Sequence, residues 1–328
     1  MKAVVFDEIG SPLEVLRLRD LPIPEAGPNE VQVKMLAASI NPGDFLYIQS
    51  LYPEPKKPAL PGQVAGNHGA GIITKVGPGV TLEPGTLVAF SHLDTWAEYA
   101  VVPAERLMPL PAGYPMEKAA QFFNLITARD MLEESQVQPG QWLALTAGNS
   151  TVATMVLQLA RARKVNVLSI VRKKQEHLDL RALGANHVLE LAAHPDDIDK
   201  RVSELTGGQD VSAIIDAVGG KLLEQLLKST AFRARVVVYG LYSPERFSLH
   251  NYELLLKELR ISAHVYRYFF DPPKPGDEPM LRELAALTAP PEFQVPFRAM
   301  HPLEDFKAAV EESFLRPESG KRFFRMTP

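Results

Sequence analysis

The sequence predicts an α/β protein in which a doubly wound parallel sheet is joined to a second, mostly β domain. Two domains are expected because 328 residues exceed the length that one hydrophobic core usually serves. Before about residue 113, short apolar runs are separated by glycine and proline, as in β domains. After that point, apolar runs alternate with helical patterns, which is typical of a parallel sheet with helices on both faces.

The mostly β domain is expected to have a barrel-like or curved-sheet form and to include both ends of the chain. Its apolar runs read KAVVF, EVQVKML, AGIITKV, GTLVAF and EYAVVP, with turn segments such as GPGV and LPAG between them. The tail from about Arg267 leaves the alternating pattern, with two further helices and a closing β run, GKRFFRM. We therefore assign residues 1–113 and 267–328 to this domain and residues 114–266 to the parallel-sheet domain.

The parallel-sheet domain is predicted as a regular series of strands and helices in a Rossmann-like architecture. Its strands are QWLALT, VNVLSIV, HVLEL, SAIIDAV, RVVVYG and RISAHVY. The first helix follows QWLALT, with four apolar residues on one face at 3.6-residue spacing: Val152, Met155, Val156 and Leu159. The later helices are expected in EHLDLRALG with Gly184 as its C-cap, from Pro195 to Leu205, in GKLLEQLLKSTA and in YELLLKEL.

The composition is that of an ordinary globular protein and excludes several classes of function. Hydrophobic residues make up 46%, charged residues 23% and the net charge is −4, so no basic patch predicts a nucleic-acid partner. No run reaches about 18 apolar residues, and MKAVVFDEIG lacks signal-peptide character, so we expect a cytoplasmic protein with no membrane partner. Because the chain has no cysteine, disulfides, thiolate nucleophiles and thiolate zinc sites are all excluded.

A dinucleotide cofactor would bind at the carboxyl ends of the parallel strands, with its pyrophosphate at the helix after the first strand. That turn reads TAGNSTVA, residues 146–153, and keeps Gly148 without the later glycines of the usual fingerprint. By itself, this turn fits a plain strand-to-helix connection as well as it fits a cofactor site.

The end of the second strand favours a phosphorylated cofactor. The segment SIVRKKQE places Arg172, Lys173 and Lys174 where this fold binds the adenosine ribose, with no acidic residue to bond a free 2′-hydroxyl. Three cations at a helix start oppose the helix dipole unless an anion is bound there. NADPH is therefore expected in preference to NADH.

The motifs of this chain resemble those of the medium-chain dehydrogenase/reductase superfamily over nearly the whole length. They occur in that family's order: MKAVVFDEIG, INPGD, AGIITKVGPGV, PAERLMPLP, VQPGQWL, QLARA, LGANHV, DAVGG and VVVYG. The resemblance implies a GroES-like catalytic domain made from both chain ends, a Rossmann domain between them and a substrate cleft where the two meet. It also implies a homodimer in which the edge strands of two sheets pair.

The resemblance also bears on metal binding. Where alcohol dehydrogenases of the superfamily carry two zinc ligands, this sequence has Asn41 and Asn67. His68 is displaced by one position, has no evident partner ligands, and is expected to line the substrate site. Since three or four converging ligands are needed to hold zinc, we expect no metal. Hydride donation from NADPH to an activated double bond then remains as the chemistry.

Two zinc-free branches of the superfamily stay open, because both share the Asn-Pro-x-Asp corner and a tyrosine after it. One branch is the NADPH quinone oxidoreductases. The other, the 2-enoyl thioester reductases, is favoured by INPGDFLYIQSLYP, AGNHG, NLITARDML and AGNSTV. The chain departs from that pattern at His68, at Thr151 in the turn, and at Arg233 and Arg235 before the fifth strand. These departures keep a third alternative open, a catalytically weak NADPH-binding protein.

The resemblance implies roles for individual residues. Tyr52 is the candidate general acid or enolate hydrogen-bond donor, and Asn41 and Asn67 are expected to orient the nicotinamide and the loop. Asp44 is expected to cap the next turn rather than to act as a base. The cofactor-binding positions are Asn67, Thr127, Gly148, Asn149, Ser150, Thr151, Val152, Arg172, Lys173, Val218, Tyr239 and Gly240.

The substrate pocket is expected to include the segment SAHVYRYFF, which follows the sixth strand at the junction of the two domains. The small-molecule substrate is an enoyl thioester or a quinone. The residues assigned to this pocket are His68, His264, Tyr268 and Phe269.

Overall fold

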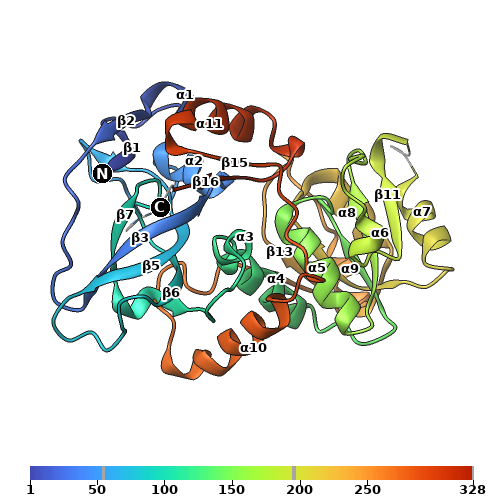
Figure 1. The fold of residues 1–328 in the computed structure, drawn as a ribbon. Coiled ribbons are helices and arrows are strands. Elements are labelled where there is room, and N and C mark those ends of the chain that lie inside the picture. The colour runs from blue at the N-terminus through green and yellow to red at the C-terminus, as the bar shows by residue number, and fades with distance from the viewer. Residues whose placement is uncertain (54–55, 194–196, 327–328) are drawn as a thin grey trace. The chain divides into compact units, whose positions relative to one another are not determined.

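The protein divides into two compact units. The first unit comprises Met1–Phe123 and Arg267–Pro328, and the second comprises Asn124–Tyr266 (Figure 1). The structure is a computed structural model, and it describes these residues: 1–53, 56–193 and 197–326.

The first boundary lies later in the chain than residue 113 because the segment up to Phe123 packs on the C-terminal part of the first unit. The hydroxyls of Tyr114 and Thr288 lie 2.6 Å apart in a buried hydrogen bond. The buried Lys118 ammonium donates to the carbonyls of Thr288, Ala289 and Pro290. These bonds hold residues 114–123 to the end of a helix that comes much later in the sequence.

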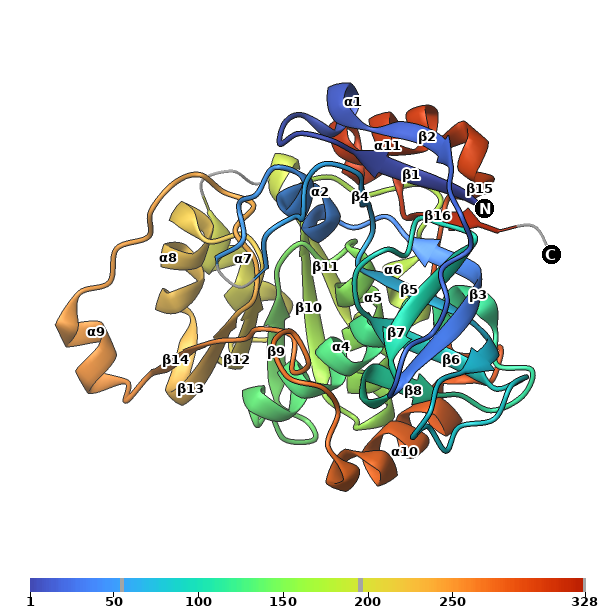
Figure 2. The ribbon, with the colours of Figure 1, turned by 90° about the vertical axis from the view of Figure 1, so that its left-hand side faces the viewer.

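The second unit is built on a six-stranded sheet in which all neighbouring strands are parallel. The strand order is β11-β10-β9-β12-β13-β14, and Figure 2 shows the central strands side by side. With β9 counted first, this is the 3-2-1-4-5-6 order of the Rossmann fold, which confirms the predicted class. The bounds are β9 (Trp142–Leu145), β10 (Asn166–Val171), β11 (His187–Glu190), β12 (Val211–Asp216), β13 (Thr230–Val238) and β14 (Arg260–Ala263).

Helices on both sides of this sheet come from the connections between its strands. Helix α5 packs with α6, and α7 packs with α8. The helices that belong wholly or mainly to this unit are α4 (Phe122–Ser135), α5 (Thr151–Ala162), α6 (Leu180–Leu183), α7 (Ile198–Leu205), α8 (Gly220–Lys228) and α9 (Asn251–Leu256). Within the described parts of the chain, no helix is both long and apolar enough to cross a membrane.

Three predicted helices are longer than those observed. The helix in GKLLEQLLKSTA ends at Lys228, because Thr230 already pairs with β12 as the first residue of β13. The helix in YELLLKEL ends at Leu256, and Glu258 beyond it has a left-handed φ of 47°. The helix in EHLDLRALG is reduced to one turn before Gly184, whose φ of 127° confirms the predicted C-cap. Residue 195, the predicted start of another helix, lies outside the described residues.

The first unit contains two β-sheets that join both ends of the chain, and their strand pairs are antiparallel except for the parallel pair of β15 and β16. A small sheet has the order β2-β1-β4, and a larger one has the order β15-β16-β3-β5-β6-β8, with β7 also paired to β3. The C-terminal strand β16 runs antiparallel to β3, and Figure 1 shows this red strand beside the blue one. The bounds are β1 (Lys2–Phe6), β2 (Arg17–Asp20), β3 (Glu30–Ser39), β4 (Gln63–Val64), β5 (His68–Val76), β6 (Leu87–Ser91), β7 (Tyr99–Pro103), β8 (Leu107–Pro109), β15 (Ala299–His301) and β16 (Arg322–Arg325).

Five α-helices of the described residues belong to this unit. They are α1 (Pro12–Val15), α2 (Pro42–Ile48), α3 (Met116–Ala119), α10 (Glu278–Thr288) and α11 (Phe306–Leu315).

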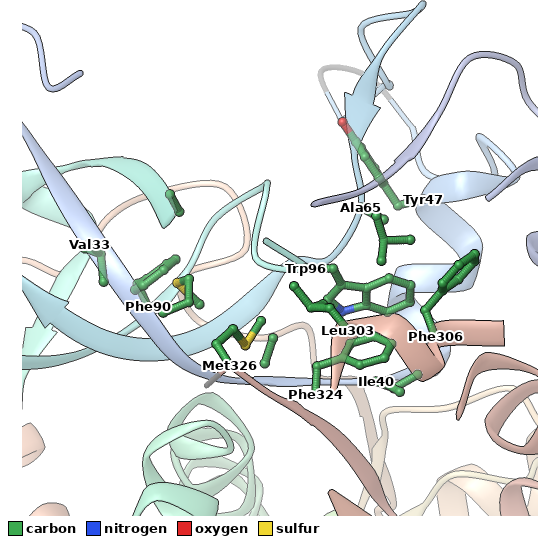
Figure 3. Close-up of a cluster of buried hydrophobic side chains, with 14 of the residues drawn as sticks. Val33, Ile40, Tyr47, Ala65, Phe90, Trp96, Leu303, Phe306, Phe324 and Met326 are labelled. Carbon is green, nitrogen blue, oxygen red and sulfur yellow. The ribbon is translucent and has the colours of Figure 1, made fainter. Parts of the chain in front are cut away.

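The core of the first unit is centred on Trp96, whose side chain is fully buried (Figure 3). Its indole packs edge-to-face against the ring of Phe324 in β16, with the ring centroids 5.1 Å apart. Its Nε1 donates to the carbonyl of Ser39 at 3.2 Å, and that residue is the last of β3. The indole therefore fixes the end of β3, from which the Asn-Pro corner leaves.

Candidate functional site

The Asn-Pro corner is held by the buried carboxylate of Asp44 in the first turn of α2. This carboxylate accepts hydrogen bonds from the backbone N–H groups of Asn41 at 2.7 Å and Asn67 at 2.9 Å. The first bond caps α2, as predicted for this residue, and the second joins α2 to the start of β5. Two segments distant in the sequence are thereby brought together, with Asn41 and Asn67 side by side.

Lys321 is a residue of this corner that the sequence analysis missed. Its ammonium donates to the carbonyl of Ile40 at 2.6 Å and to Oδ1 of Asn41, while Nδ2 of Asn41 donates to Ser39 Oγ at 2.7 Å. These contacts hold the Asn41 amide in one orientation. Burial lowers the pKa of Lys321 and raises that of Asp44, while each charge favours the charged form of the other.

The sequence offered one signal for Lys321, its place just before the β run RFFR. That signal does not say which strand the run joins. Only the pairing of β16 with β3 shows that Lys321 lies at the Asn-Pro corner.

The hydroxyl of Tyr52 lies over the first turn of α2, where Gly43 leaves room for it. A side chain at Gly43 would place its Cβ 2.6 Å from the hydroxyl oxygen, which is closer than two non-bonded atoms can lie. Burial, followed by the nearby charge of Asp44, raises the pKa of Tyr52 to about 12. The phenol therefore stays protonated at neutral pH and can donate a hydrogen bond.

Two of the four predicted pocket residues lie near Tyr52 or its corner. The ring of Phe269 meets the ring of Tyr52 edge-on at 5.2 Å. His68, next to Asn67, stacks on Phe123 with centroids 3.6 Å apart. Burial, followed by the charges of Lys56 and Lys321, lowers the pKa of His68 well below 6.5, so this imidazole is neutral.

The other two predicted pocket residues have different surroundings. Tyr268 is only 3% exposed, and its side chain is hydrogen-bonded to Asp277. His264 belongs to the second unit, where its Nδ1 lies 2.8 Å from a carboxylate oxygen of Glu134. Both side chains are thus engaged within the fold of their own unit.

The second unit gathers its predicted cofactor residues at the carboxyl ends of its strands. The N–H of Gly148 donates to Ile170 at 2.9 Å, and a Cβ at this glycine would clash with Ser169. Asn149 Nδ2 donates to the carbonyl of Lys173 at 3.3 Å, so the turn is tied to the end of β10. Ser150 caps α5. The free N–H groups of this helix start suit an anionic phosphate.

Asp216, at the end of β12, orders the neighbouring strand ends. Its carboxylate accepts from Thr146 Oγ1 at 2.7 Å and from the N–H groups of Val218 and Gly219 at 3.2 and 2.8 Å. Its carbonyl accepts from the N–H of Tyr239 at 2.9 Å. The predicted positions Val218 and Tyr239 are therefore held next to the first turn of the unit.

The remaining predicted cofactor residues of this unit lie on α5, after β13 and on α4. Thr151 is the first residue of α5 and Val152 follows it, both half-buried. Gly240 follows Tyr239 and lies against the backbone of Ala217. Thr127 is buried on α4.

Arg172 and Lys173 are exposed cations at the end of β10. Among the described residues, neither has a carboxylate within 4.0 Å, whereas Lys174 lies 4.0 Å from Glu190 and its N–H donates to that same carboxylate. Of the three cations at this strand end, Arg172 and Lys173 thus have no acidic partner among the described residues. In the described ranges, no group of three or more histidine, aspartate or glutamate side chains converges as metal ligands would.

Comparison with known proteins identifies the family to which this fold belongs. Residues 27–112 match the family described as "Alcohol dehydrogenase GroES-like domain", and residues 151–284 match "Zinc-binding dehydrogenase". Two relatives are named mitochondrial enoyl-[acyl-carrier-protein] reductase. The one from Bos taurus is 31% identical over 99% of this chain and 89% of that protein. The one from Xenopus tropicalis is 30% identical over 95% and 91%.

A solved structure gives the same result at the level of the fold. It is titled a putative NADPH:quinone reductase from Bacillus thuringiensis, and it is 26% identical with a TM-score of 0.87, over 99% of this chain and 98% of that one. Together with the strand order, these likenesses define a two-domain protein with a GroES-like and a Rossmann part. The chain belongs to the medium-chain dehydrogenase/reductase superfamily, as its motifs predicted.

The electrostatic link between Lys321 and Asp44 can be measured by a double-mutant cycle. Lys321→Met should lower the free energy of unfolding by about 2 kcal/mol, because Asn41 loses a charged donor and Asp44 loses the cation that favours its ionised form. Asp44→Asn should also destabilise, and the double variant should lose less than the sum of the two. Chemical denaturation gives these values, with the exposed Lys307→Met as control. Strictly additive losses would show that the two charges are not coupled.

Proposed function

We propose that this protein is an NADPH-dependent, zinc-independent reductase that transfers hydride to an activated C=C bond, with 2-enoyl thioesters as its substrates. The observation that carries this proposal is the phenol of Tyr52. Its hydroxyl makes no hydrogen bond to any described residue, it stays protonated, and it lies at the corner formed by Asn41, Asp44 and Asn67. The relatives named enoyl-[acyl-carrier-protein] reductase support the same chemistry.

The reaction needs a donor of this kind. Hydride addition to the β-carbon of an enoyl thioester leaves an enolate, whose oxygen must be stabilised and whose α-carbon must gain a proton. A neutral phenol can donate to either atom, and a positioned acid of this type contributes about 10²–10⁴-fold. Tyr52 is held for this task by its packing on Gly43 and on the ring of Phe269.

The second unit offers a fitting place for NADPH, which supplies the hydride when bound. The pyrophosphate would lie on the N–H groups of Thr151 and Val152 at the start of α5, which have no acceptor among the described residues. Arg172 and Lys173 would bind the 2′-phosphate. Asn41 and Asn67 keep their predicted role of orienting the nicotinamide. The direction of the Asn41 amide is fixed because its Oδ1 accepts from Lys321 and its Nδ2 donates to Ser39 Oγ.

Zinc independence follows from the donor set at the corner. Asn41 and Asn67 are neutral amides, and Oδ1 of Asn41 already accepts from Lys321. An ammonium bonded to that oxygen disfavours a cation at the same place. The chemistry of the site is therefore proton donation by a phenol.

Quinone reduction is the second candidate, and the structure titled a putative NADPH:quinone reductase favours it. A quinone accepts hydride without a proton being delivered to carbon. The two activities therefore differ in their need for the Tyr52 hydroxyl.

We further propose a homodimer in which β14 pairs with the same strand of a second copy. This strand forms one edge of the six-stranded sheet, and all four of its residues are exposed. Apolar side chains near it are also exposed, among them Leu255 at 71% and Val265 at 58%. Pairing would cover both the edge and these side chains.

A cytoplasmic location remains a prediction from composition. The two relatives described above are named mitochondrial. Fractionation of the source cells would test it.

Tyr52→Phe should lower kcat with a crotonyl thioester at least about tenfold and leave the Kd for NADPH nearly unchanged, because the hydroxyl acts on the transition state. Quinone reduction should be much less affected. Wild-type turnover should not fall through phenol ionisation between about pH 7 and 9, because the pKa of Tyr52 lies at about 12. An equal loss of both activities in the variant would remove the proton-donor role.

Arg172→Ala should weaken NADPH binding by roughly 10- to 100-fold and hardly change NADH binding, since a guanidinium bonds phosphate in a bidentate manner. Lys174→Ala is the matched control, because Lys174 lies beside Glu190 and should contribute little. Fluorescence titration of both coenzymes measures this, and the NADPH preference should shrink with added salt. Equal affinities of the wild type for NADPH and NADH would contradict the assignment.

A further inference from the structure

Two cations lie beside the aromatic residue that supports Tyr52. The ammonium of Lys56 is 3.8 Å from the centre of the Phe269 ring, the same ring that meets Tyr52 edge-on. Arg106 donates from Nη2 to the carbonyl of Phe270 at 2.8 Å. The rings of Phe269 and Phe270 pack edge-on, with their centroids 4.6 Å apart. One aromatic side chain therefore separates Lys56 from the candidate proton donor, and Arg106 is bonded to the next residue.

These cations have no acidic partner among the described residues, where no carboxylate lies within 4.0 Å of either. Burial, followed by the charge of Arg106, lowers the pKa of Lys56 to about 8. The pKa of His92 is lowered to about 4, mainly by burial and next by the charges of Arg106 and Lys56. This imidazole therefore adds no charge. The carboxylate of Asp44, whose charge acts on Tyr52, is bonded to two N–H groups and interacts with Lys321.

Other lysines of the protein show what a buried ammonium normally has around it. Lys118 donates to three carbonyls, and Lys257 donates to the carbonyls of Leu227, Lys228 and Thr230. Lys56 instead has only a ring face and no oxygen acceptor among the described residues. A desolvated ammonium without an oxygen partner is unfavourable, and a bound anion would relieve that cost.

We propose that Lys56 and Arg106 bind an anionic oxygen group, a carboxylate or a phosphate, carried by the acceptor substrate. This inference rests on the proposed function, because the acceptor is what Tyr52 must reach. The phosphates of the coenzyme have their own proposed donors in the second unit, at the first N–H groups of α5 and at Arg172. The anionic group can come from two sources: a carboxylate on the acyl chain, or the phosphate of a phosphopantetheine arm that carries the thioester.

Two pairs of acceptors distinguish these sources, each pair differing by one charged group. The first pair is crotonyl-pantetheine and crotonyl-4′-phosphopantetheine. The second is the N-acetylcysteamine thioester of fumarate and its methyl ester. The wild type should prefer the charged member of one pair by at least about tenfold in kcat/KM, since a hydrogen bond between charged groups is strong.

Lys56→Met should abolish the preference for the charged acceptor, because kcat/KM falls for that acceptor alone. Arg106→Gln should reduce the same preference. Lys57→Met is the matched control, because Lys57 is exposed, donates to the carbonyl of Ser50 at 2.8 Å and should keep the wild-type preference. Melting temperatures show whether each variant is folded. The proposal is overturned if the wild type treats both members of both pairs alike, or if Lys56→Met slows both members equally.

A binding measurement separates this proposal from the proposed function. If no acceptor is reduced, the proposed function fails, and the anion site is then tested by calorimetry. One pair of ligands is butyryl-pantetheine and butyryl-4′-phosphopantetheine. The other pair is the succinyl analogues of the fumarate thioester and its methyl ester. Tighter binding of a charged member by about tenfold, lost in Lys56→Met, supports the site. Equal binding of charged and neutral members overturns it.

Discussion

The hydrogen bonds of the buried Asp44 carboxylate are the interaction on which the arrangement of the first unit depends. This carboxylate bonds the backbone of Asn41 and of Asn67, and so joins the helix after β3 to the strand that begins at His68. A charge in this position is unfavourable without compensation, which the two N–H donors and Lys321 supply. Since Lys321 comes from the C-terminal tail, the pairing of β16 with β3 is what brings this lysine to the corner.

Asp216 has the same kind of role in the second unit. Its carboxylate and carbonyl bond to the ends of the neighbouring strands, and this ties the turn after β9 to the residues after β12 and β13. In each unit, one aspartate at a strand end or helix start therefore converts separate loops into a fixed edge. A fixed edge suits hydride transfer, because a small displacement of the reacting groups costs much of the rate.

The sequence was sufficient where a periodic pattern or a motif was local. The apolar runs from QWLALT to RISAHVY predicted the strands of the parallel sheet, and Gly184 predicted a helix end. It was insufficient where the outcome depended on distant pairing. Thr230 looked helical in GKLLEQLLKSTA, yet it pairs with β12, and Lys321 has no local pattern that places it beside Asn41. Lys56 was missed for the same reason, since its partner ring at Phe269 is far away in the sequence.

In the proposed function, the neutral phenol of Tyr52 at the Asp44 corner donates a hydrogen bond or a proton during the reduction of a C=C bond conjugated to a thioester. The most direct test measures NADPH oxidation by the wild type with a crotonyl thioester and with a simple quinone side by side, and identifies the product. We expect kcat/KM to be higher for the crotonyl thioester than for the quinone, with the saturated butyryl thioester as product. Rapid quinone reduction with the crotonyl thioester left unchanged would contradict it.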